Sequence, residues 1–353
     1  MRVWIDLHNS PHPLLFAPII RRFGALGHEV LITARENAQT VELARDRWPE
    51  VVVIGAASPP GRPAKAAAIA GRIDALRRWT VGTRPDVALS HNSYAQISAA
   101  RMTGIPTVTA MDYEHQPANH LAFRLADRIL LPAPLSRSRV RHQGATRAKT
   151  TSYAGYKEEI YLGDFSFDAT ALDRAGVDRS GARALVITRP PPSGAAYHRF
   201  GNPLYAAALE VLAAQSSLCC VALARTAAQR DVLAGLGLNN FAFPRAAQDA
   251  RSLMYSADLV VGAGGTMTRE AALLGVPTYT VFAGRPSAVD DALVERGLMR
   301  RLRSPEELAR IVPRSRPPVG LDELRGRGRG IIETFVEATL EAAARPRGHS
   351  SRR

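Results

Sequence analysis

Short apolar segments alternate with amphipathic helical segments along almost the whole chain, and this alternation constrains the fold more than any other feature. Strands are expected in the first half at Arg2–Leu7, Glu29–Thr33, Val51–Ile54, Val87–Ser90, Thr107–Ala110 and Arg128–Leu131. Helical periodicity lies between them, at Leu14–Leu26, Ala38–Arg47, Ala64–Arg78 and Tyr94–Thr103. Nearly continuous apolar strands that alternate with helices are typical of a parallel sheet covered on both faces. The pattern therefore predicts an α/β fold with a doubly wound parallel sheet.

The second half of the chain repeats this alternation, which indicates a second domain. Strands are expected there at Ala184–Thr188, Cys219–Ala224, Leu259–Gly262 and Thr278–Val281. A length of 353 residues suits two domains. Between the halves, the segment 161–182 loses strong periodicity and is expected to hold the linker. We expect two Rossmann-like domains that face each other across a cleft, at 1–165 and 180–344, and a disordered basic tail at 345–353.

The chain is strongly basic, which favours anionic partners. Its formal net charge is +14 and its pI is about 10.6, a balance that suits phosphates, nucleic acid or an acidic membrane surface. Nucleic acid is not favoured, because no nucleic-acid-binding motif accompanies the arginines. No segment reaches the roughly 18 consecutive apolar residues of a membrane span, and the first strand reads as a strand rather than as a signal peptide. We expect a cytoplasmic protein that can bind peripherally to an anionic membrane.

The segment Ala257–Pro277 carries the most informative motif. The strand Leu259–Gly262 leads into the glycine turn Gly262–Gly265, and Thr266 is expected to cap a helix that runs to about Leu274. Glycines let backbone N–H groups approach a phosphate without interference from Cβ, and a helix N-terminus adds unsatisfied donors and partial positive charge. The motif therefore predicts a diphosphate site, although the same glycines would also suit a turn that serves packing alone.

The full string from Gly264 to Pro277 resembles the donor-site signature of glycosyltransferase-B (GT-B) enzymes. It is most similar to the UDP-N-acetylglucosamine 2-epimerases and the peptidoglycan N-acetylglucosaminyl transferase. The resemblance implies that Gly264, Gly265 and Thr266 contact the diphosphate of a nucleotide sugar, with UDP as the expected nucleotide. It also implies that Glu270 binds the ribose. Glu270 lies one helical turn beyond Thr266, where a carboxylate can accept hydrogen bonds from ribose hydroxyls.

Three polar clusters follow three of the predicted strands in the first half. They are Asp6–Pro13, Ser90–Tyr94 and Met111–His120. Because open parallel sheets bind ligands beyond the carboxyl ends of their strands, we expect the clusters to converge on one cleft. A general base must be a histidine or a carboxylate within reach of an acceptor hydroxyl. The predicted catalytic residues are His12, Asp112 and Glu114, whereas Asp6 is expected to be structural and to bond loop N–H groups.

The whole chain, from about residue 1 to 335, resembles an uncharacterised family of predicted glycosyltransferases related to those epimerases. The resemblance is carried by Trp4–Asp6 with Asn9–His12, by Gly27–Arg35, Gly155–Leu162 and Thr188–Pro190, and by the glycine motif. It implies the two-domain GT-B fold. The chain lacks the Gly-Thr-Arg-Pro-Glu string that the epimerases carry after the first strand, which argues against 2-epimerase activity.

Three further charged residues are candidate ligands of the nucleotide sugar. Arg189 follows a strand and precedes Pro190, so it is either a bidentate phosphate ligand or a surface arginine beside a rigid turn. Asp290 lies where the resemblance places acceptors of sugar hydroxyls. Lys157 is expected to be a solvated charge.

Two activities fit these features. The first is a glycosyltransferase that moves a sugar from a nucleoside diphosphate donor to an unknown acceptor, such as an anionic lipid-linked one. The helix start and Arg189 would stabilise the leaving diphosphate, so neither a metal nor another cofactor is expected. The second is a nucleotide-sugar epimerase or hydrolase, with Asp112 and Glu114 as acid and base. A metal site in the N-terminal clusters is a weaker alternative, because no ligand spacing there is diagnostic.

Overall fold

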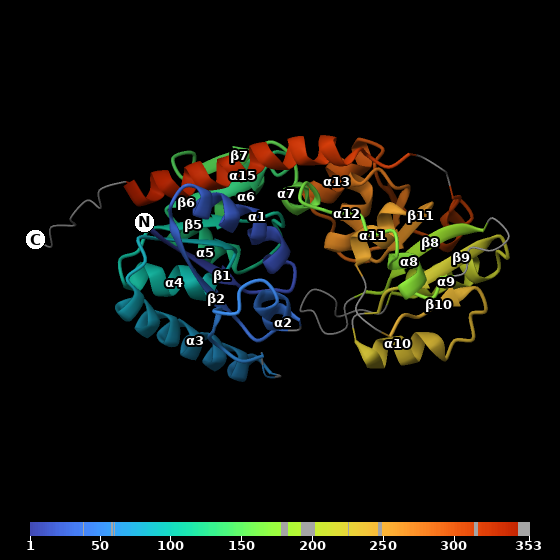
Figure 1. Ribbon diagram of the computed structural model, residues 1–353, viewed down its shortest axis with the longest axis horizontal. Coiled ribbons are helices and arrows are strands. Elements are labelled where there is room, and N and C mark those ends of the chain that lie inside the picture. The colour runs from blue at the N-terminus through green and yellow to red at the C-terminus, as the bar shows by residue number, and fades with distance from the viewer. Residues whose placement is uncertain are drawn as a thin grey trace, which may run out of the picture. The chain divides into compact units, whose positions relative to one another are not determined.

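The structure of the protein, a computed structural model, consists of two compact units. Unit 1 combines Met1–Tyr161 with the chain from Gly326 onward, and unit 2 is Leu162–Arg325. Figure 1 labels the helices and strands of both units. The residues that the structure describes are 1–37, 39–57, 59, 61–177, 183–191, 202–224, 226–245, 249–313 and 317–344.

Unit 1 is built on a seven-stranded sheet with the order β3-β2-β1-β4-β5-β6-β7. The strands are β1 (Arg2–Leu7), β2 (Glu29–Ala34), β3 (Val52–Val53), β4 (Val87–His91), β5 (Thr107–Ala110), β6 (Arg128–Pro132) and β7 (Thr150–Tyr153). Every pair of neighbours runs parallel. The carboxyl ends of these strands therefore lie at one edge of the sheet, where the polar clusters predicted from the sequence begin.

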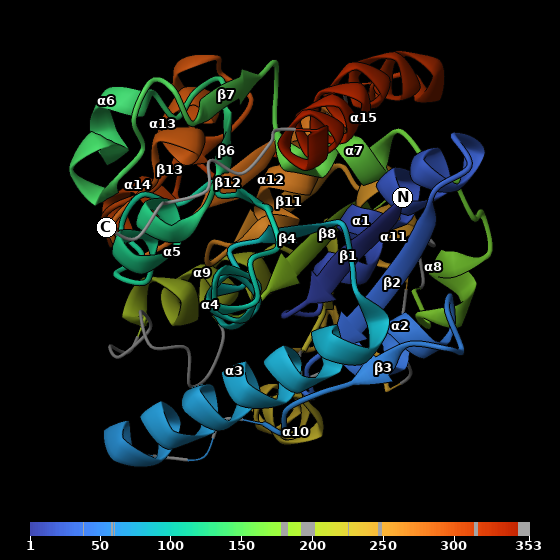
Figure 2. The ribbon, with the colours of Figure 1, turned by 90° about the vertical axis from the view of Figure 1, so that its left-hand side faces the viewer.

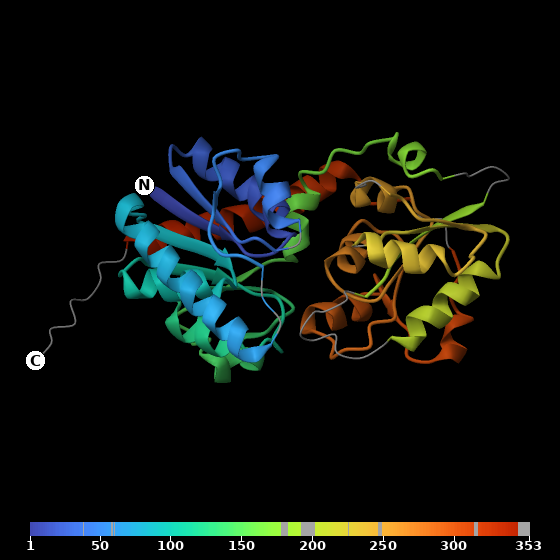
Figure 3. The same cartoon turned by 90° about the horizontal axis from the view of Figure 1, so that it is seen from below.

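Helices cover both faces of this sheet (Figure 2). They are α1 (His12–Ala25), α2 (Thr40–Arg45), α3 (Arg62–Thr83), α4 (Tyr94–Met102), α5 (Asn119–Leu125), α6 (Arg137–Val140), the 3-10 helix η1 (Arg141–Gln143), α7 (Lys157–Leu162) and α15 (Leu321–Ala344). On one face, Leu76 of α3 and Ala95 of α4 pack with Trp4 of β1 in a buried cluster. Figure 3 shows α3 and α4 across this face. The opposite face is covered by α1 and by the part of α15 that belongs to unit 1.

Unit 2 is built on a six-stranded sheet with the order β10-β9-β8-β11-β12-β13, again with parallel neighbours. Its strands are β8 (Ala184–Arg189), β9 (Leu218–Ala222), β10 (Phe241–Ala242), β11 (Leu259–Gly262), β12 (Thr278–Thr280) and β13 (Arg300–Arg301). Its helices are α8 (Ala171–Arg174), α9 (Pro203–Ala213), α10 (Ala227–Ala234), α11 (Ala250–Tyr255), α12 (Thr266–Leu273), α13 (Ala288–Glu295) and α14 (Pro305–Leu308). Both sheets therefore have the doubly wound strand order in which the first strand is central.

The last helix corrects the predicted domain boundaries. The sequence assigns 180–344 to one domain, but the chain from Gly326 onward belongs to unit 1. The physical reason is the apolar face of α15, on which Ile331, Phe335 and Ala338 are buried. Phe335 contacts Tyr153 of β7, with ring centroids 5.4 Å apart.

The predicted linker and tail lie partly or wholly outside the described residues. Within the predicted linker the structure describes residues up to 177, and these include the short helix α8 (Ala171–Arg174). The residues 178–182 and the predicted disordered tail, 345–353, are outside the described ranges. Within those ranges, no helix combines the length and the apolar character that crossing a bilayer requires.

Candidate functional site

The polar residues that follow β1, β4 and β5 start from the same edge of the unit 1 sheet. The register aligns Asp6 of β1 with Ser90 of β4, and His91 of β4 with Ala110 of β5. Because the three strands are parallel, the loops that leave their carboxyl ends begin side by side. The structure thus brings the three polar clusters to one edge, as the strand pattern predicts.

Asp6 is part of a buried structural network. Its Oδ1 accepts hydrogen bonds from Arg72 Nη2 (2.7 Å) and Thr33 Oγ1 (2.6 Å), and its Oδ2 accepts one from Ser93 Oγ (2.5 Å). Burial raises the pKa of Asp6, but these partners, Arg72 foremost, outweigh burial and leave the pKa below its ordinary value. The predicted structural role is confirmed, although its partners are side chains rather than loop N–H groups.

His12, the predicted general base, accepts a backbone hydrogen bond in this arrangement. It begins α1 and is 3 % exposed. Its Nδ1 accepts a hydrogen bond from the backbone N–H of His8 at 3.0 Å. Burial, and secondarily the charge of His91, lowers the pKa of His12 well below its ordinary value. A neutral imidazole whose Nδ1 accepts a hydrogen bond carries its proton on Nε2, so His12 offers no free lone pair.

The two predicted acids, Asp112 and Glu114, have separate partners. Asp112 Oδ1 lies 3.4 Å from His91 Nε2, and Asp112 Oδ2 forms an ion pair with Lys157 Nζ. Glu114 Oε1 lies 3.2 Å from Arg139 Nη1. The structure therefore places Asp112 with a histidine and a lysine, and ties Glu114 to an arginine that comes from α6.

Lys157 is a member of the site that sequence reasoning missed. It was predicted to be solvated, yet it is only 7 % exposed. Its Nζ pairs with Asp112 and lies 2.9 Å from Oε1 of the fully buried Glu158. The position of Lys157 just after β7 could have placed it at the same sheet edge as the polar clusters. The sequence did not predict this strand, because the segment Thr150–Tyr153 is polar. A lysine followed by two glutamates otherwise has the pattern of an exposed helix.

The glycine motif forms the turn between β11 and α12, as predicted. Gly264 and Gly265 both have a φ of +92°, which lies in the region that favours glycine. A Cβ on Gly264 would also lie 2.5 Å from the ring of Phe282. Gly265, not Thr266, is the N-cap of α12, and Thr266 is the first helical residue. No side chain caps this end of α12. The backbone amide groups at the start of the helix therefore lie next to the glycine residues without a side-chain acceptor.

Arg189 ends β8 directly beside this turn. The β8–β11 register aligns Arg189 with Gly262. Arg189 Nη1 lies 3.5 Å from Met267 Sδ, and Arg189 Nε has no hydrogen-bond partner among the described residues. Burial lowers the pKa of Arg189, and the carboxylate of Glu270 acts in the opposite direction. Glu270 is itself 8 % exposed. The structure therefore brings together Arg189, the glycine turn and Glu270, which the sequence singled out separately.

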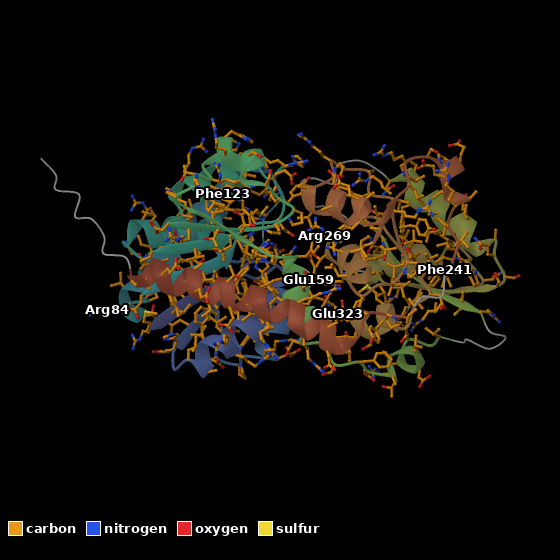
Figure 4. The ribbon with its side chains drawn as sticks, turned by 90° about the horizontal axis from the view of Figure 1, so that it is seen from above. Arg84, Phe123, Glu159, Phe241, Arg269 and Glu323 are labelled. Carbon is orange, nitrogen blue, oxygen red and sulfur yellow. The ribbon has the colours of Figure 1, made fainter. Side chains whose placement is uncertain are left out.

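Asp290, the predicted acceptor of a sugar hydroxyl, has partners from α12 and from the start of α13. Ser287 and Asp290 form a capping box at the start of α13. Arg269, which Figure 4 labels, places its Nε 2.7 Å from Asp290 Oδ1 and its Nη2 3.2 Å from Asp290 Oδ2. Burial raises the pKa of Asp290, but Arg269 and Ser287 outweigh it and leave the pKa below its ordinary value. Both carboxylate oxygens are thus engaged in holding α13 against α12.

The metal site considered from the sequence does not form in the part of the chain that the structure describes. No group of three or more His, Cys, Asp or Glu side chains there could hold a metal ion. Both oxygens of Asp6, for example, already accept hydrogen bonds from Arg72, Thr33 and Ser93.

The protein has two doubly wound parallel sheets, and in unit 2 a glycine turn connects β11 to α12. This arrangement defines a protein of the GT-B fold. The chain belongs to the family described as "Protein of unknown function (DUF354)", which matches residues 1–333. An uncharacterised protein of Methanocaldococcus jannaschii is 27% identical to it over 339 residues, which are 94% of each chain. The resemblance to an uncharacterised family is thereby confirmed.

Solved structures confirm the predicted fold. The UDP-GlcNAc 2-epimerase of Methanocaldococcus jannaschii, in complex with UDP-GlcNAc and UDP, superposes with a TM-score of 0.68 at 13% identity. It covers 96% of this chain and 100% of that one. The glycotransferase of kitacinnamycin superposes with a TM-score of 0.59 at 18% identity and covers 97% of both chains. At such identities the likeness establishes the fold, and the activity has to be argued from the site.

Proposed function

We propose that this protein is an enzyme that binds a nucleoside diphosphate sugar and transfers the sugar to an acceptor. The observation that carries the proposal is a juxtaposition in unit 2. Arg189, the Gly264–Thr266 turn and Glu270 lie together where β8 and β11 end. Doubly wound sheets bind their ligands at this edge.

The turn and the start of α12 supply what a diphosphate requires. Amide groups of the first helical turn and the partial positive charge of the helix end favour an anion. Arg189 adds a planar guanidinium that suits bidentate binding of phosphate. When the bond between the sugar and the diphosphate breaks, negative charge collects on the leaving oxygen, and fixed donors aimed at that oxygen lower the barrier. We propose that this stabilisation operates without a metal.

Glu270 is proposed to recognise the ribose. It lies one turn into α12, is almost fully buried, and acts electrostatically on Arg189. A buried carboxylate can accept hydrogen bonds from both hydroxyls of a ribose. UDP is the proposed nucleotide, a choice supported by the likeness to an epimerase that was solved with UDP-GlcNAc and UDP.

The second candidate is a nucleotide-sugar epimerase or hydrolase that uses the same donor site. The likeness to the epimerase structure favours it. The structure of unit 1 favours transfer, because an epimerase or hydrolase was expected to use Asp112 and Glu114 as an acid–base pair. Asp112 is paired with Lys157, and Glu114 is paired with Arg139. A carboxylate paired with a cation is a weak base.

The donor site is tested by calorimetric and thermal-shift titration with UDP, GDP, dTDP and UDP-GlcNAc. A ligand that binds only the folded state raises its melting temperature. We expect UDP to bind to the wild-type protein and Arg189→Ala to weaken UDP binding at least tenfold. Glu270→Ala should weaken the binding of UDP more than the binding of inorganic pyrophosphate. Arg310→Ala is the matched control, because its side chain is 64% exposed and pairs only with a neighbour on the surface.

Product analysis separates the two activities. A transferase given UDP-GlcNAc alone should release UDP only slowly, whereas an epimerase or hydrolase should convert the nucleotide sugar without any acceptor. If none of the four nucleotides binds, the glycine motif is a structural turn, and the proposal is wrong.

A further inference from the structure

The imidazole of His91 lies beside a carboxylate at the carboxyl end of β4. His91 is the last residue of β4 and is 8 % exposed. Its Nε2 is buried, forms no hydrogen bond with a described residue, and lies 3.4 Å from Asp112 Oδ1. A carboxylate at this distance attracts an N–H group and repels a lone pair, so it favours the tautomer with the proton on Nε2. Nδ1 of His91 forms no hydrogen bond with any described residue, so its lone pair is available.

The second oxygen of Asp112 forms an ion pair with Lys157 Nζ. Lys157 in turn lies 2.9 Å from Glu158, so one buried ammonium group is shared by two carboxylates. An opposite charge at this range favours the ionised acid. Removing the proton from a neutral acceptor would therefore fall to the imidazole rather than to Asp112.

A buried chain of amide groups fixes the loop of His91 to the loop of Asp112. Asn92, which directly follows His91, has a φ of +55° and donates from Nδ2 to Asn119 Oδ1 at 3.1 Å. Asn119 donates to the backbone carbonyl of Tyr113 at 3.0 Å and to Gln143 Oε1 at 3.2 Å. Gln143 donates to the backbone carbonyl of Glu114 at 2.6 Å.

The backbone of Asn92 turns the chain directly after His91. Its φ of +55° lies in the left-handed region, which asparagine adopts more readily than most residues other than glycine. The turn lies between the two loops that carry His91 and Asp112. The amide chain therefore acts as a positioning scaffold for these two side chains.

We propose that His91, oriented by Asp112, is the general base of unit 1, in place of His12. The inference rests on the proposed transferase function. In the displacement step the acceptor oxygen bonds to the anomeric carbon, and the bond from that carbon to the diphosphate breaks. Its electron pair leaves with the nucleoside diphosphate, and the acceptor proton moves to Nδ1 of His91. The imidazolium then lies beside Asp112, while His12 serves as a hydrogen-bond donor.

Turnover is the first test. We expect His91→Gln to slow UDP release from UDP-GlcNAc, with water as acceptor, by about 100-fold or more, the usual range for a lost general base. UDP affinity should change less than about threefold, because the nucleotide site is in unit 2. His120→Gln is the matched control, since His120 is an exposed histidine on α5. A His91→Gln enzyme that keeps turnover and UDP binding overturns the proposal.

Nitrogen-15 NMR of the imidazoles is the second test and does not require turnover. His91 and His12 are assigned by their loss in His91→Gln and His12→Gln, and the unfolding temperature of each variant checks its fold. We expect the neutral His91 ring to carry its proton on Nε2, and Asp112→Asn to produce a mixture of tautomers. The other charged or titratable groups facing His91 are His12 of α1 and, beyond Asp112, Lys157 of α7.

The two failures are distinguishable. If no nucleotide binds the wild-type protein, the proposed function is wrong whatever the tautomer of His91. If UDP binds but the neutral His91 ring carries its proton on Nδ1, or if Asp112→Asn leaves the tautomer unchanged, the donor site stands. The assignment of His91 as the base is then wrong.

Discussion

Asp6 and Arg72 form an ion pair in the interior of unit 1, with 2.7 Å between Arg72 Nη2 and Asp6 Oδ1. The two side chains are 0% and 4% exposed. Arg72 also donates from Nε to the carbonyl of Ile54 at 2.8 Å. The pair therefore fastens α3 to the central strand β1 and to the chain that follows β3.

Asp6→Asn should destabilise the protein by about 3–5 kcal/mol, because it leaves the Arg72 guanidinium buried without its counter-charge. Urea unfolding at pH 7.5 measures the loss. Asp74→Asn, on the helix α3 that also carries Arg72, is the control, since Asp74 is 46% exposed and pairs with Arg77 at the surface. Such surface pairs contribute about 0–1 kcal/mol. If both substitutions lower the unfolding free energy equally, the buried ion pair does not stabilise the packing of α3 against β1.

Buried His8 makes the stability of unit 1 dependent on pH. Burial and, next, the charge of Arg72 lower the pKa of His8 to about 4, from an ordinary value near 6.5. Between these values the unfolded chain binds a proton that the folded chain does not. The contribution of neutral His8 is therefore complete above pH 6.5 and is lost as the pH falls towards 4.

The whole shift corresponds to roughly 3 kcal/mol of unfolding free energy, of which about 2 kcal/mol is lost between pH 7.5 and pH 5. We expect His8→Asn to remove that part of the pH dependence. Urea unfolding of both proteins at the two pH values measures it. If wild type and variant lose the same free energy on acidification, His8 is not the source.

The sequence predicted the strands that have a clear local pattern of apolar residues. Strands with continuous apolar runs, such as β1, β5 and β11, were found within a residue of their bounds, because burial on both faces leaves a clear signature. The edge strands β7, β10 and β13 were not predicted. β13 is only Arg300–Arg301, and β7 is largely polar, so neither has an apolar run.

The site residues were likewise predictable only where local sequence determines them. The glycine turn could be predicted because its backbone conformation depends on consecutive residues. The pairing of Asp112 with Lys157 and His91 could not, because it depends on side chains from β4, α7 and the loop after β5 that meet only in the folded sheet. His12 was predicted as a base from its residue type and its place in a polar cluster after the first strand, whereas its tautomer depends on the backbone N–H of His8.

Gly264 should tolerate no side chain. Gly264→Ala would have to keep a φ of +92° and place its Cβ 2.5 Å from the Phe282 ring. We expect a loss of about 2–4 kcal/mol, from left-handed strain and overpacking together, and at least a tenfold loss of UDP affinity as the start of α12 shifts. Gly297→Ala is the control, because Gly297 has a φ of +69° but nothing within 4 Å. If Gly264→Ala costs no more than Gly297→Ala and UDP still binds, the contact with Phe282 does not shape the turn.

Gly328 allows α15 to lie against α7, and its neighbours in the same helix provide an internal comparison. A Cβ on Gly328 would lie 2.6 Å from the carbonyl oxygen of Glu159, a residue that Figure 4 shows beside α15. Gly328→Ala should therefore destabilise the protein by about 1–3 kcal/mol.

Gly330→Ala should have the opposite sign. Gly330 is exposed in the interior of α15 and nothing lies within 4 Å of its added Cβ. Alanine is favoured over glycine in a helix by about 0.5–1 kcal/mol, so this variant should unfold at a higher urea concentration than wild type. Two substitutions of the same type, two residues apart, then separate helix propensity from packing. If Gly328→Ala also stabilises the protein, α15 does not lie against Glu159 as closely as the structure shows.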